Sequence, residues 1–302
     1  MVVMGVSPLR VSAQSSVVGP LVLESTSSAQ AAALGGAFPL GSGTADVLFY
    51  HPGALGRAQG LSAYRTSYGG AGGMSSVAAA TSWFGGTVGV GLQSLNYRGS
   101  GGLAGGAQTE SAIRTQPTAG TTPQTLAESV LSLGFAREVG PVEVGLVGKW
   151  VQMRAGAEQD AGVSVDVGTS VDAGPALIAL AVRNIGSELS APSGSLDPPV
   201  AVSLTAASDV MQLRGLDLSA AARLDRTGGG DFVPGAGLEV AWWPIQGRTF
   251  AARVGYGHPV EDDPASGITA GGSFRGDQIG LHYAFGKLND DDVVHRFSLT
   301  WR

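Results

Sequence analysis

The last ten residues of the chain, VVHRFSLTWR (293–302), alternate between two kinds of side chain. One face would carry Val293, His295, Phe297, Leu299 and Trp301, and the other Val294, Arg296, Ser298, Thr300 and Arg302. A period of two is the pattern of a β-strand whose two faces meet different surroundings. The stretch before it, QIGLHYAF (278–285), has the same period. The chain therefore ends in two predicted strands.

The same alternation recurs along most of the chain, between clusters of turn-forming residues. We predict fourteen strands, at 61–69, 74–84, 87–98, 126–138, 141–153, 161–170, 175–185, 199–208, 214–225, 232–242, 248–257, 266–274, 276–285 and 293–302. An even number is typical of single-chain membrane barrels, and most of these segments are long enough to cross a bilayer at a tilt. The pattern predicts an all-β, transmembrane antiparallel β-barrel.

Composition excludes most other classes of protein. Of 302 residues, 48 are Gly, none is Cys, 14% are charged and the net charge is −6. A disordered chain would be more charged, and a nucleic-acid binder would be basic. The apolar run from Ala176 to Val182 is the longest, and it is far shorter than the roughly twenty residues of a membrane-spanning helix. A soluble β-sandwich is the remaining alternative.

The predicted connections favour the barrel over the sandwich. Tight turns, such as Gly85-Gly86 and Val139-Gly140, alternate with longer loops at 99–125, 154–160, 186–198, 226–231, 258–265 and 286–292. Outer-membrane barrels have this asymmetry, with short turns toward the periplasm and long loops outside.

Charged residues alternate with the apolar positions of the predicted strands. Because a charge on the lipid face is costly, we expect these side chains to point into the lumen as paired acids and bases. This predicted lumen charge ladder consists of Glu128, Glu143, Lys149, Asp166, Arg183, Asp217, Arg223, Glu239, Arg253 and Arg296. Structural pairing is one reading of the ladder, and a tuned ion pathway is the other.

The N-terminal part of the chain does not follow the strand pattern. Residues 1–13 resemble the end of a secretory signal peptide, with small residues before a cleavage point after Ala13. Residues 14–58 contain an apolar stretch interrupted by Pro52 and Gly53, which could not form a lipid-facing strand. We therefore expect a hatch or plug inside the lumen, followed by the barrel at 59–302.

The stretch LGGAFPLGSGTADVLFYHPGAL (34–55) resembles the N-terminal signature of the PorV/PorQ group of outer-membrane proteins, relatives of the FadL fatty-acid transporters. Segments 131–152, 162–189 and 282–302 continue the likeness. The chain departs from the group at Tyr50-His51, where Trp-Asn is commoner, and at Gly53-Ala54, which inverts the usual order. The resemblance implies a fourteen-stranded barrel with an N-terminal hatch.

No motif for catalysis or for a cofactor is present in the sequence. The four His residues have no zinc-ligand spacing, and no nucleophile elbow, Walker A or dinucleotide motif occurs. We expect neither an enzyme, nor a cofactor, nor a metal site, nor a nucleic-acid partner. The candidates for contact with a ligand in the hatch and lumen are Phe38, Phe49, Tyr50, His51 and Pro52.

Three functions fit these features in the outer membrane of a Gram-negative-type cell. The resemblance to PorV implies an accessory of type IX-like secretion and surface attachment, with secretion-system proteins or secreted substrates as partners of the extracellular loops. The wider resemblance to FadL implies a passive transporter of hydrophobic small molecules. A purely structural barrel of the envelope is the third. All three place outer-membrane lipid around the barrel.

Overall fold

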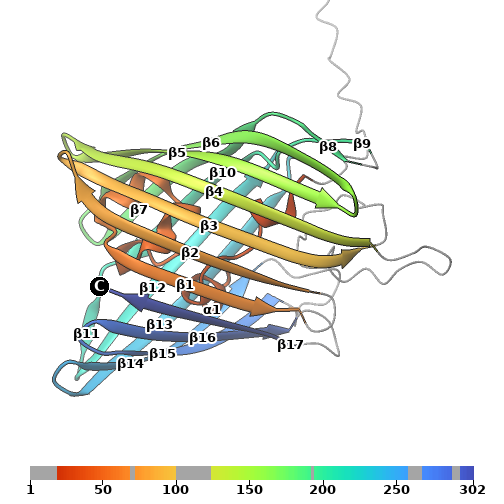
Figure 1. Cartoon of the computed structure of the whole chain (residues 1–302). Helices are drawn as coiled ribbons and strands as arrows, with labels where there is room; N and C mark the ends of the chain where they lie inside the picture. The colour runs from red at the N-terminus through yellow and green to blue at the C-terminus, as the bar shows by residue number, and fades with distance from the viewer. Residues whose placement is uncertain (1–18, 69–71, 100–123, 192–193, 258–266, 288–292) are drawn as a thin grey trace, which may run out of the picture.

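The computed structural model describes residues 19–68, 72–99, 124–191, 194–257, 267–287 and 293–302. Antiparallel strands form a barrel around a short helical segment (Figure 1). The wall strands are β1 (Gly60–Ser67), β2 (Gly72–Trp83), β3 (Gly86–Gly99), β4 (Gln124–Val139), β5 (Val142–Ala155), β6 (Glu158–Asp172), β7 (Ala176–Gly186), β10 (Ala201–Ser208), β11 (Met211–Leu213), β12 (Leu216–Thr227), β13 (Phe232–Ile245), β14 (Arg248–Gly257), β15 (Ile268–Arg275), β16 (Ile279–Lys287) and β17 (Val293–Trp301).

The barrel is closed on all sides. β1 pairs with both β2 and β17, and β10 pairs with both β7 and β12, so these pairings close the sheet into a ring. The short β11 continues β10 after residues 209–210 and pairs with the start of β12. With β10 and β11 counted as one interrupted strand, the barrel has fourteen strands. The predicted all-β barrel fold is confirmed.

Side chains alternate between the two faces of the wall as the period of two predicts. Along β16 and β17, inward residues are mostly buried and outward ones mostly exposed. The outward residues are largely apolar: Leu281 is 52% exposed and Phe297 is 56% exposed. A barrel surrounded by hydrocarbon has this distribution, because apolar side chains then face lipid rather than water.

The two ends of the barrel differ in their connections. One end, here called the turn end, carries the short turns at 84–85, 140–141, 173–175, 246–247 and 276–278, together with the C-terminus (Figure 1). The opposite end is here called the loop end. The strand ends that flank the longer predicted loops 99–125, 258–265 and 286–292 lie at this end, and the loops themselves lie mostly outside the described residues.

One predicted loop is wrong, and another contains a short hairpin. The loop expected at 154–160 is only a turn of residues 156–157, because β5 and β6 extend further than their apolar patterns. The connection 186–198 contains a hairpin, β8 (Leu189–Ala191) with β9 (Gly194–Leu196). Leu189 and Leu196 are each 1% exposed, so burial against the barrel orders these short strands without a long alternating pattern.

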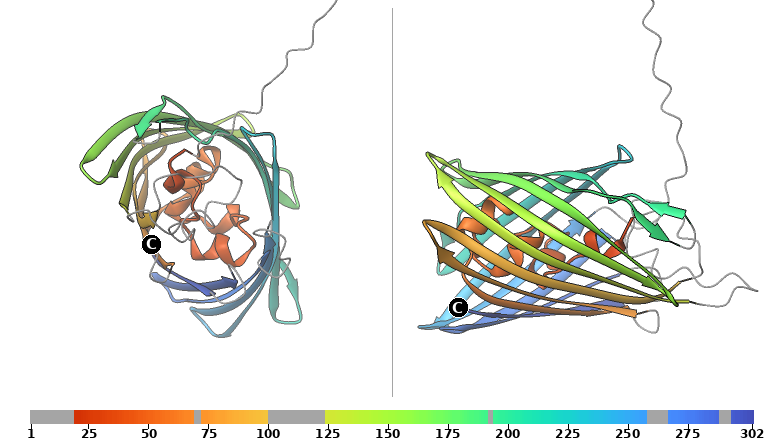
Figure 2. Two further views of the ribbon diagram at one scale, coloured as in Figure 1. Left: turned by 90° about the vertical axis from the view of Figure 1, so that its right-hand side faces the viewer. Right: turned by 45° about the horizontal axis from the view of Figure 1, so that its top comes forward.

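Residues 19–58, here called the lumenal segment, lie inside the barrel (Figure 2). They form η1 (Leu21–Leu23), α1 (Ala29–Ala33), η2 (Leu40–Ser42), η3 (Ala45–Phe49) and η4 (Pro52–Arg57). The hydroxyl of Ser28 caps α1 by accepting a hydrogen bond from the amide of Ala31. Among the described residues, no helix is long and apolar enough to span a membrane. That this segment acts as a hatch stays a prediction, as do the predicted domain boundaries.

Inward glycines of the wall receive the lumenal segment. A Cβ atom at Gly145 would lie 2.0 Å from the carbonyl oxygen of Pro52, and one at Gly91 would lie 2.6 Å from the ring of Phe49. Only glycine permits so close an approach at these positions. The segment therefore fills the space that these glycines leave in the lumen.

Candidate functional site

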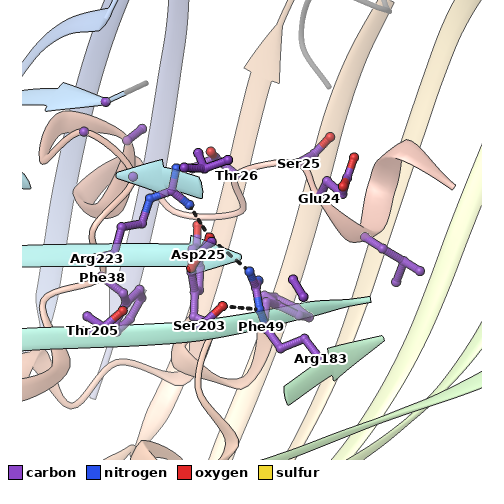
Figure 3. Close-up of a pocket in the computed structure, with 18 of the residues that line it drawn as sticks. Glu24, Ser25, Thr26, Phe38, Phe49, Arg183, Ser203, Thr205, Arg223 and Asp225 are labelled. Atoms are coloured by element: carbon purple, nitrogen blue, oxygen red, sulfur yellow. Dashed lines mark hydrogen bonds and ion pairs between the residues drawn. The ribbon is translucent and has the colours of Figure 1, made fainter. Parts of the chain in front are cut away.

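A cavity of about 220 Å³ lies inside the barrel, between the lumenal segment and the wall. Figure 3 shows side chains from both parts facing it. The lumenal segment contributes the apolar side chains of Leu23, Phe38 and Phe49, and also the polar side chains of Glu24, Ser25 and Thr26. The wall contributes polar and charged side chains of β7, β10 and β12, which include Arg183, Asn184, Ser203, Thr205, Arg223, Asp225 and Thr227. Aromatic rings of the lumenal segment and arginines of the wall thus line the same cavity.

Two arginines of the cavity wall share a single carboxylate. Nη1 of Arg223 lies 2.9 Å from Oδ2 of Asp225, and Nη2 of Arg183 lies 3.3 Å from the same oxygen. Nε of Arg183 also donates to Oγ of Ser203, at 3.0 Å (Figure 3). The side chains of Arg183 and Arg223 are 15% and 24% exposed. The cluster therefore has one positive charge in excess beside the cavity, and guanidinium groups bind carboxylates and phosphates well.

His51 connects the lumenal segment to this wall. Its Nε2 lies 2.7 Å from Oγ1 of Thr205, and its Nδ1 has no hydrogen-bond partner among the described residues. Burial, followed by the positive charge of Arg183, lowers the pKa of His51 to about 3. The ring is therefore neutral at neutral pH and offers one nitrogen that no described protein group satisfies.

Aromatic side chains form the apolar side of the cavity. The rings of Phe38 and Tyr50 are tilted, with centroids 4.8 Å apart. The hydroxyl of Tyr50 accepts a hydrogen bond from the amide of Ser27 at 2.8 Å, and burial raises the pKa of Tyr50. Neutral aromatic groups at this spacing provide an apolar contact surface. Pro52, the fifth candidate, instead packs against β5 through its carbonyl group.

A buried polar network supports the cavity wall. The register of β6 and β7 shifts between Val165 and Val167, and Asn184 adopts a left-handed conformation with φ of 61°. Asn tolerates this conformation because its side chain finds local partners. Asn184 accepts a hydrogen bond from Nζ of Lys149 at 2.8 Å, and Lys149 also pairs with Asp166 at 2.6 Å. The irregular strand thus anchors a buried ion pair next to the cavity.

Glu128 and Arg296, two members of the predicted ladder, are also buried and face the lumen. Glu128 accepts hydrogen bonds from the amide of Val22 and the hydroxyl of Tyr97, each at 2.8 Å. It therefore binds the start of the lumenal segment. Arg296 is 6% exposed and lines the cavity.

Four further ladder residues, Glu143, Asp217, Glu239 and Arg253, lie away from the cavity. Glu143 pairs with Arg57 of the lumenal segment at 3.3 Å, and Glu239 pairs with Arg253 at 2.5 Å. Asp217 lies on β12, near the turn end. The ten ladder residues thus form several separate contacts rather than one continuous row.

Asp225, Thr205 and Asn184 are among the cavity residues that were not predicted from the sequence. Asp225 is two positions after Arg223, so the period of two that selected Arg223 places both on one face and could have found it. Thr205 and Asn184 carry no comparable signal. The contact of Thr205 with His51 joins residues 154 positions apart in sequence, and the conformation of Asn184 depends on a shift in strand register.

The described residues define a closed barrel of fourteen antiparallel strands with an internal cavity lined by aromatic rings and by a cluster of arginines. The sequence matches no protein-family model and no curated protein. Solved structures do share the fold. A FadL homologue of Pseudomonas aeruginosa matches with a TM-score of 0.56 and 10% identity, over 92% of this chain and 98% of that chain.

Two similar structures are named as channels or transporters. The toluene transporter TbuX of Ralstonia pickettii matches with a TM-score of 0.53 and 12% identity, over 93% of this chain and 99% of that one. A mutant of the monoaromatic hydrocarbon channel TodX matches with a TM-score of 0.54 and 13% identity, over 89% and 96%. At the level of the fold, the resemblance to FadL-like barrels is confirmed. The finer likeness to PorV/PorQ stays a prediction.

Proposed function

We propose that this chain is an outer-membrane channel that takes up small hydrophobic molecules carrying one acidic group. The cavity carries the proposal, because it is lined both by the aromatic rings of Phe38 and Tyr50 and by the excess positive charge of Arg183 and Arg223. An apolar body would contact the rings and an anionic group would contact a guanidinium. The apolar outer surface of the barrel supports placement in a membrane.

The structural neighbours support transport over the other readings. Their names describe a toluene transporter and a monoaromatic hydrocarbon channel, and the fold is shared over most of each chain. The expected role in secretion depends on the loops at 99–125, 258–265 and 286–292, which lie mostly outside the described residues. It stays a prediction, as do the structural role and the expectation that the chain is not an enzyme.

Binding to the detergent-solubilised full chain tests the role of the acidic group. The probes are 4-isopropylbenzoate and the neutral 4-isopropylbenzyl alcohol, which differ chiefly in the carboxylate. We expect calorimetry to give a dissociation constant about tenfold lower for the carboxylate, which corresponds to about 1.4 kcal/mol. Arg223→Gln should abolish this preference, whereas Arg226→Gln, which alters an exposed residue of the same strand, should leave it unchanged.

Uptake tests transport itself. Liposomes of phosphatidylcholine that contain the full chain should accumulate radiolabelled 4-isopropylbenzoate faster than protein-free liposomes. Equal rates would overturn the proposed transport. Equal affinities for the acid and the alcohol would overturn the role of the two arginines.

A further inference from the structure

The outside of the barrel carries a groove that the proposed transport does not use. It measures about 630 Å³ and lies over β1 and β14–β17. Four aromatic side chains, Phe250, Phe274, Tyr283 and Phe297, contribute to its lining, with centroids 5.2 Å apart for Phe250 and Phe274 and 5.1 Å for Tyr283 and Phe297. We call it the outer groove. Its apolar lining suits a hydrocarbon chain.

The hollow exists because a glycine occupies an outward position among these rings. Gly272 pairs with Tyr283, Tyr283 pairs with Phe297, and Phe297 pairs with Arg65, so the four residues form one row across β15, β16, β17 and β1. A Cβ atom at Gly272 would meet only the carbonyl oxygen of Ala251, at 3.3 Å. Close packing therefore does not demand glycine here, and its missing side chain leaves room on the outer surface.

A positive charge lies at one side of the outer groove. Arg65 lines it, two residues before β1 ends toward the loop end. Nη1 of Arg65 donates to Oγ of Ser75 at 2.6 Å, and both side chains are on the outer surface. The described outward positions of β1, β2 and β14–β17 contain no carboxylate. A guanidinium on a membrane-facing surface needs an anion, and no acidic side chain of these strands supplies one.

We infer that the outer groove binds one molecule of a phosphorylated outer-leaflet glycolipid of the lipid A type. One acyl chain lies along the aromatic rings and over Gly272, and a phosphate group binds Arg65. The chemistry fits both parts, since the groove is apolar and the guanidinium forms charge-assisted hydrogen bonds with phosphate. This inference rests on the proposed outer-membrane location, but it concerns a surface separate from the internal cavity.

Native mass spectrometry of the detergent-solubilised full chain tests the inference. The probes are hexa-acylated lipid A with two phosphates and the same lipid with both phosphates removed. Arg65→Gln removes the phosphate contact, and Gly272→Leu fills the groove. The matched controls are on β5: Arg154→Gln alters an exposed arginine near the loop end, and Gly148→Leu adds a side chain at an outward glycine with nothing within 4 Å of its Cβ position.

The natural chain should bind one phosphorylated lipid A at least about tenfold more tightly than the dephosphorylated lipid. Arg65→Gln should abolish that difference, and Gly272→Leu should weaken binding of both lipids. The two β5 variants should behave like the natural chain, and heat-modifiable gel migration should show that all four variants fold.

Equal effects of Arg65→Gln and Arg154→Gln would overturn the inference. It would also be overturned if a second copy of the chain occupied the groove, which would be seen as a dimer that is lost in Gly272→Leu. Uptake of 4-isopropylbenzoate is measured without lipid A, so failure here leaves the proposed transport unaffected.

Discussion

Two parts of the lumen wall, β3–β6 and β7, β10 and β12, have the same alternating strands but contact the lumenal segment differently. Beside β3–β6, the inward positions include Gly89, Gly91, Gly134, Gly145 and Gly168, and the segment packs directly against them. Beside β7, β10 and β12, the inward positions include Arg183, Ser203, Thr205, Arg223 and Asp225, and a cavity remains. The wall at β3–β6 packs against the segment, and the wall at β7, β10 and β12 lines the internal cavity.

This difference shows that alternation determines the barrel while the choice of inward residue determines what the lumen does. Glycine lets helical backbone approach the wall, where burying one large apolar side chain such as Leu48 or Phe49 stabilises the fold by about 1.5–3 kcal/mol. On the other side, Arg183 and Arg223 pair with Asp225, and the segment contacts this side at Gly36, whose Cβ position lies 2.7 Å from the guanidinium of Arg223.

The largest expected effect comes from breaking the ion pair between Lys149 and Asp166, at the boundary between the two sides. Lys149→Met leaves a buried carboxylate without its cation, which should lower the free energy of unfolding by about 3–5 kcal/mol. Urea unfolding in micelles, followed by tryptophan fluorescence, measures this loss. The double variant Lys149→Met/Asp166→Leu should recover part of it. A loss below about 1 kcal/mol in the single variant would contradict the account.

Adding a side chain to an inward glycine of β3–β6 should displace the lumenal segment. Gly145→Leu places atoms where the carbonyl of Pro52 lies, so it should destabilise the fold by about 1–3 kcal/mol. Limited proteolysis should then cut the segment faster, while the barrel keeps its heat-modifiable migration. Gly148→Leu, an outward change on the same strand, is the matched control and should have little effect. Similar cleavage of both variants would show that the close contact between Gly145 and the lumenal segment does not hold the segment in place.

Removing the negative charge of Asp225 should strengthen the binding of an anion in the cavity. Asp225→Asn leaves Arg183 and Arg223 without their shared anion, so the affinity for 4-isopropylbenzoate should rise by about fivefold to tenfold, or about 1 kcal/mol. The affinity for 4-isopropylbenzyl alcohol should stay the same. Calorimetry compares the two probes, and a parallel change for both would mean that the variant altered the shape of the cavity rather than its charge.

The smallest expected effect is a dependence of stability on pH through His51. Its pKa is lowered from 6.5 to about 3 in the folded chain, so its contribution to stability is complete above pH 6.5 and is lost as the pH falls toward 3. The difference in thermal midpoint between the natural chain and His51→Gln should therefore shrink between pH 7.5 and pH 4. A constant difference would place a charged ring in the folded state.

The fold was predictable from sequence because it depends on local pattern. Period-two alternation and turn residues located fourteen strands, and most boundaries differ from the structure by only a few residues. The hairpin of β8 and β9 was missed because its order comes from burial of Leu189 and Leu196 rather than from alternation. The turn at 156–157 was predicted as a longer loop for a related reason, since its flanking strand ends are polar.

The cavity was less predictable because it depends on which strands become neighbours. The ladder residues were selected by face, but pairing Lys149 with Asp166 needs the register of β5 and β6. The meeting of His51 with Thr205 requires a chain that has already folded back into its own barrel. Period alone identified the inward face, and it could not distinguish a position that receives the lumenal segment from one that lines a cavity.

The most direct test of the account compares two single cysteines on β12, in a chain that has no cysteine of its own. Thr227 lines the cavity and Leu224 faces outward. In liposomes, a charged maleimide should label Thr227→Cys, and 4-isopropylbenzoate should slow that labelling, while Leu224→Cys should react only after detergent is added. Rapid labelling of Leu224→Cys in intact liposomes would contradict a lipid-facing exterior. Labelling of Thr227→Cys at the same rate with and without 4-isopropylbenzoate would contradict a ligand-binding interior.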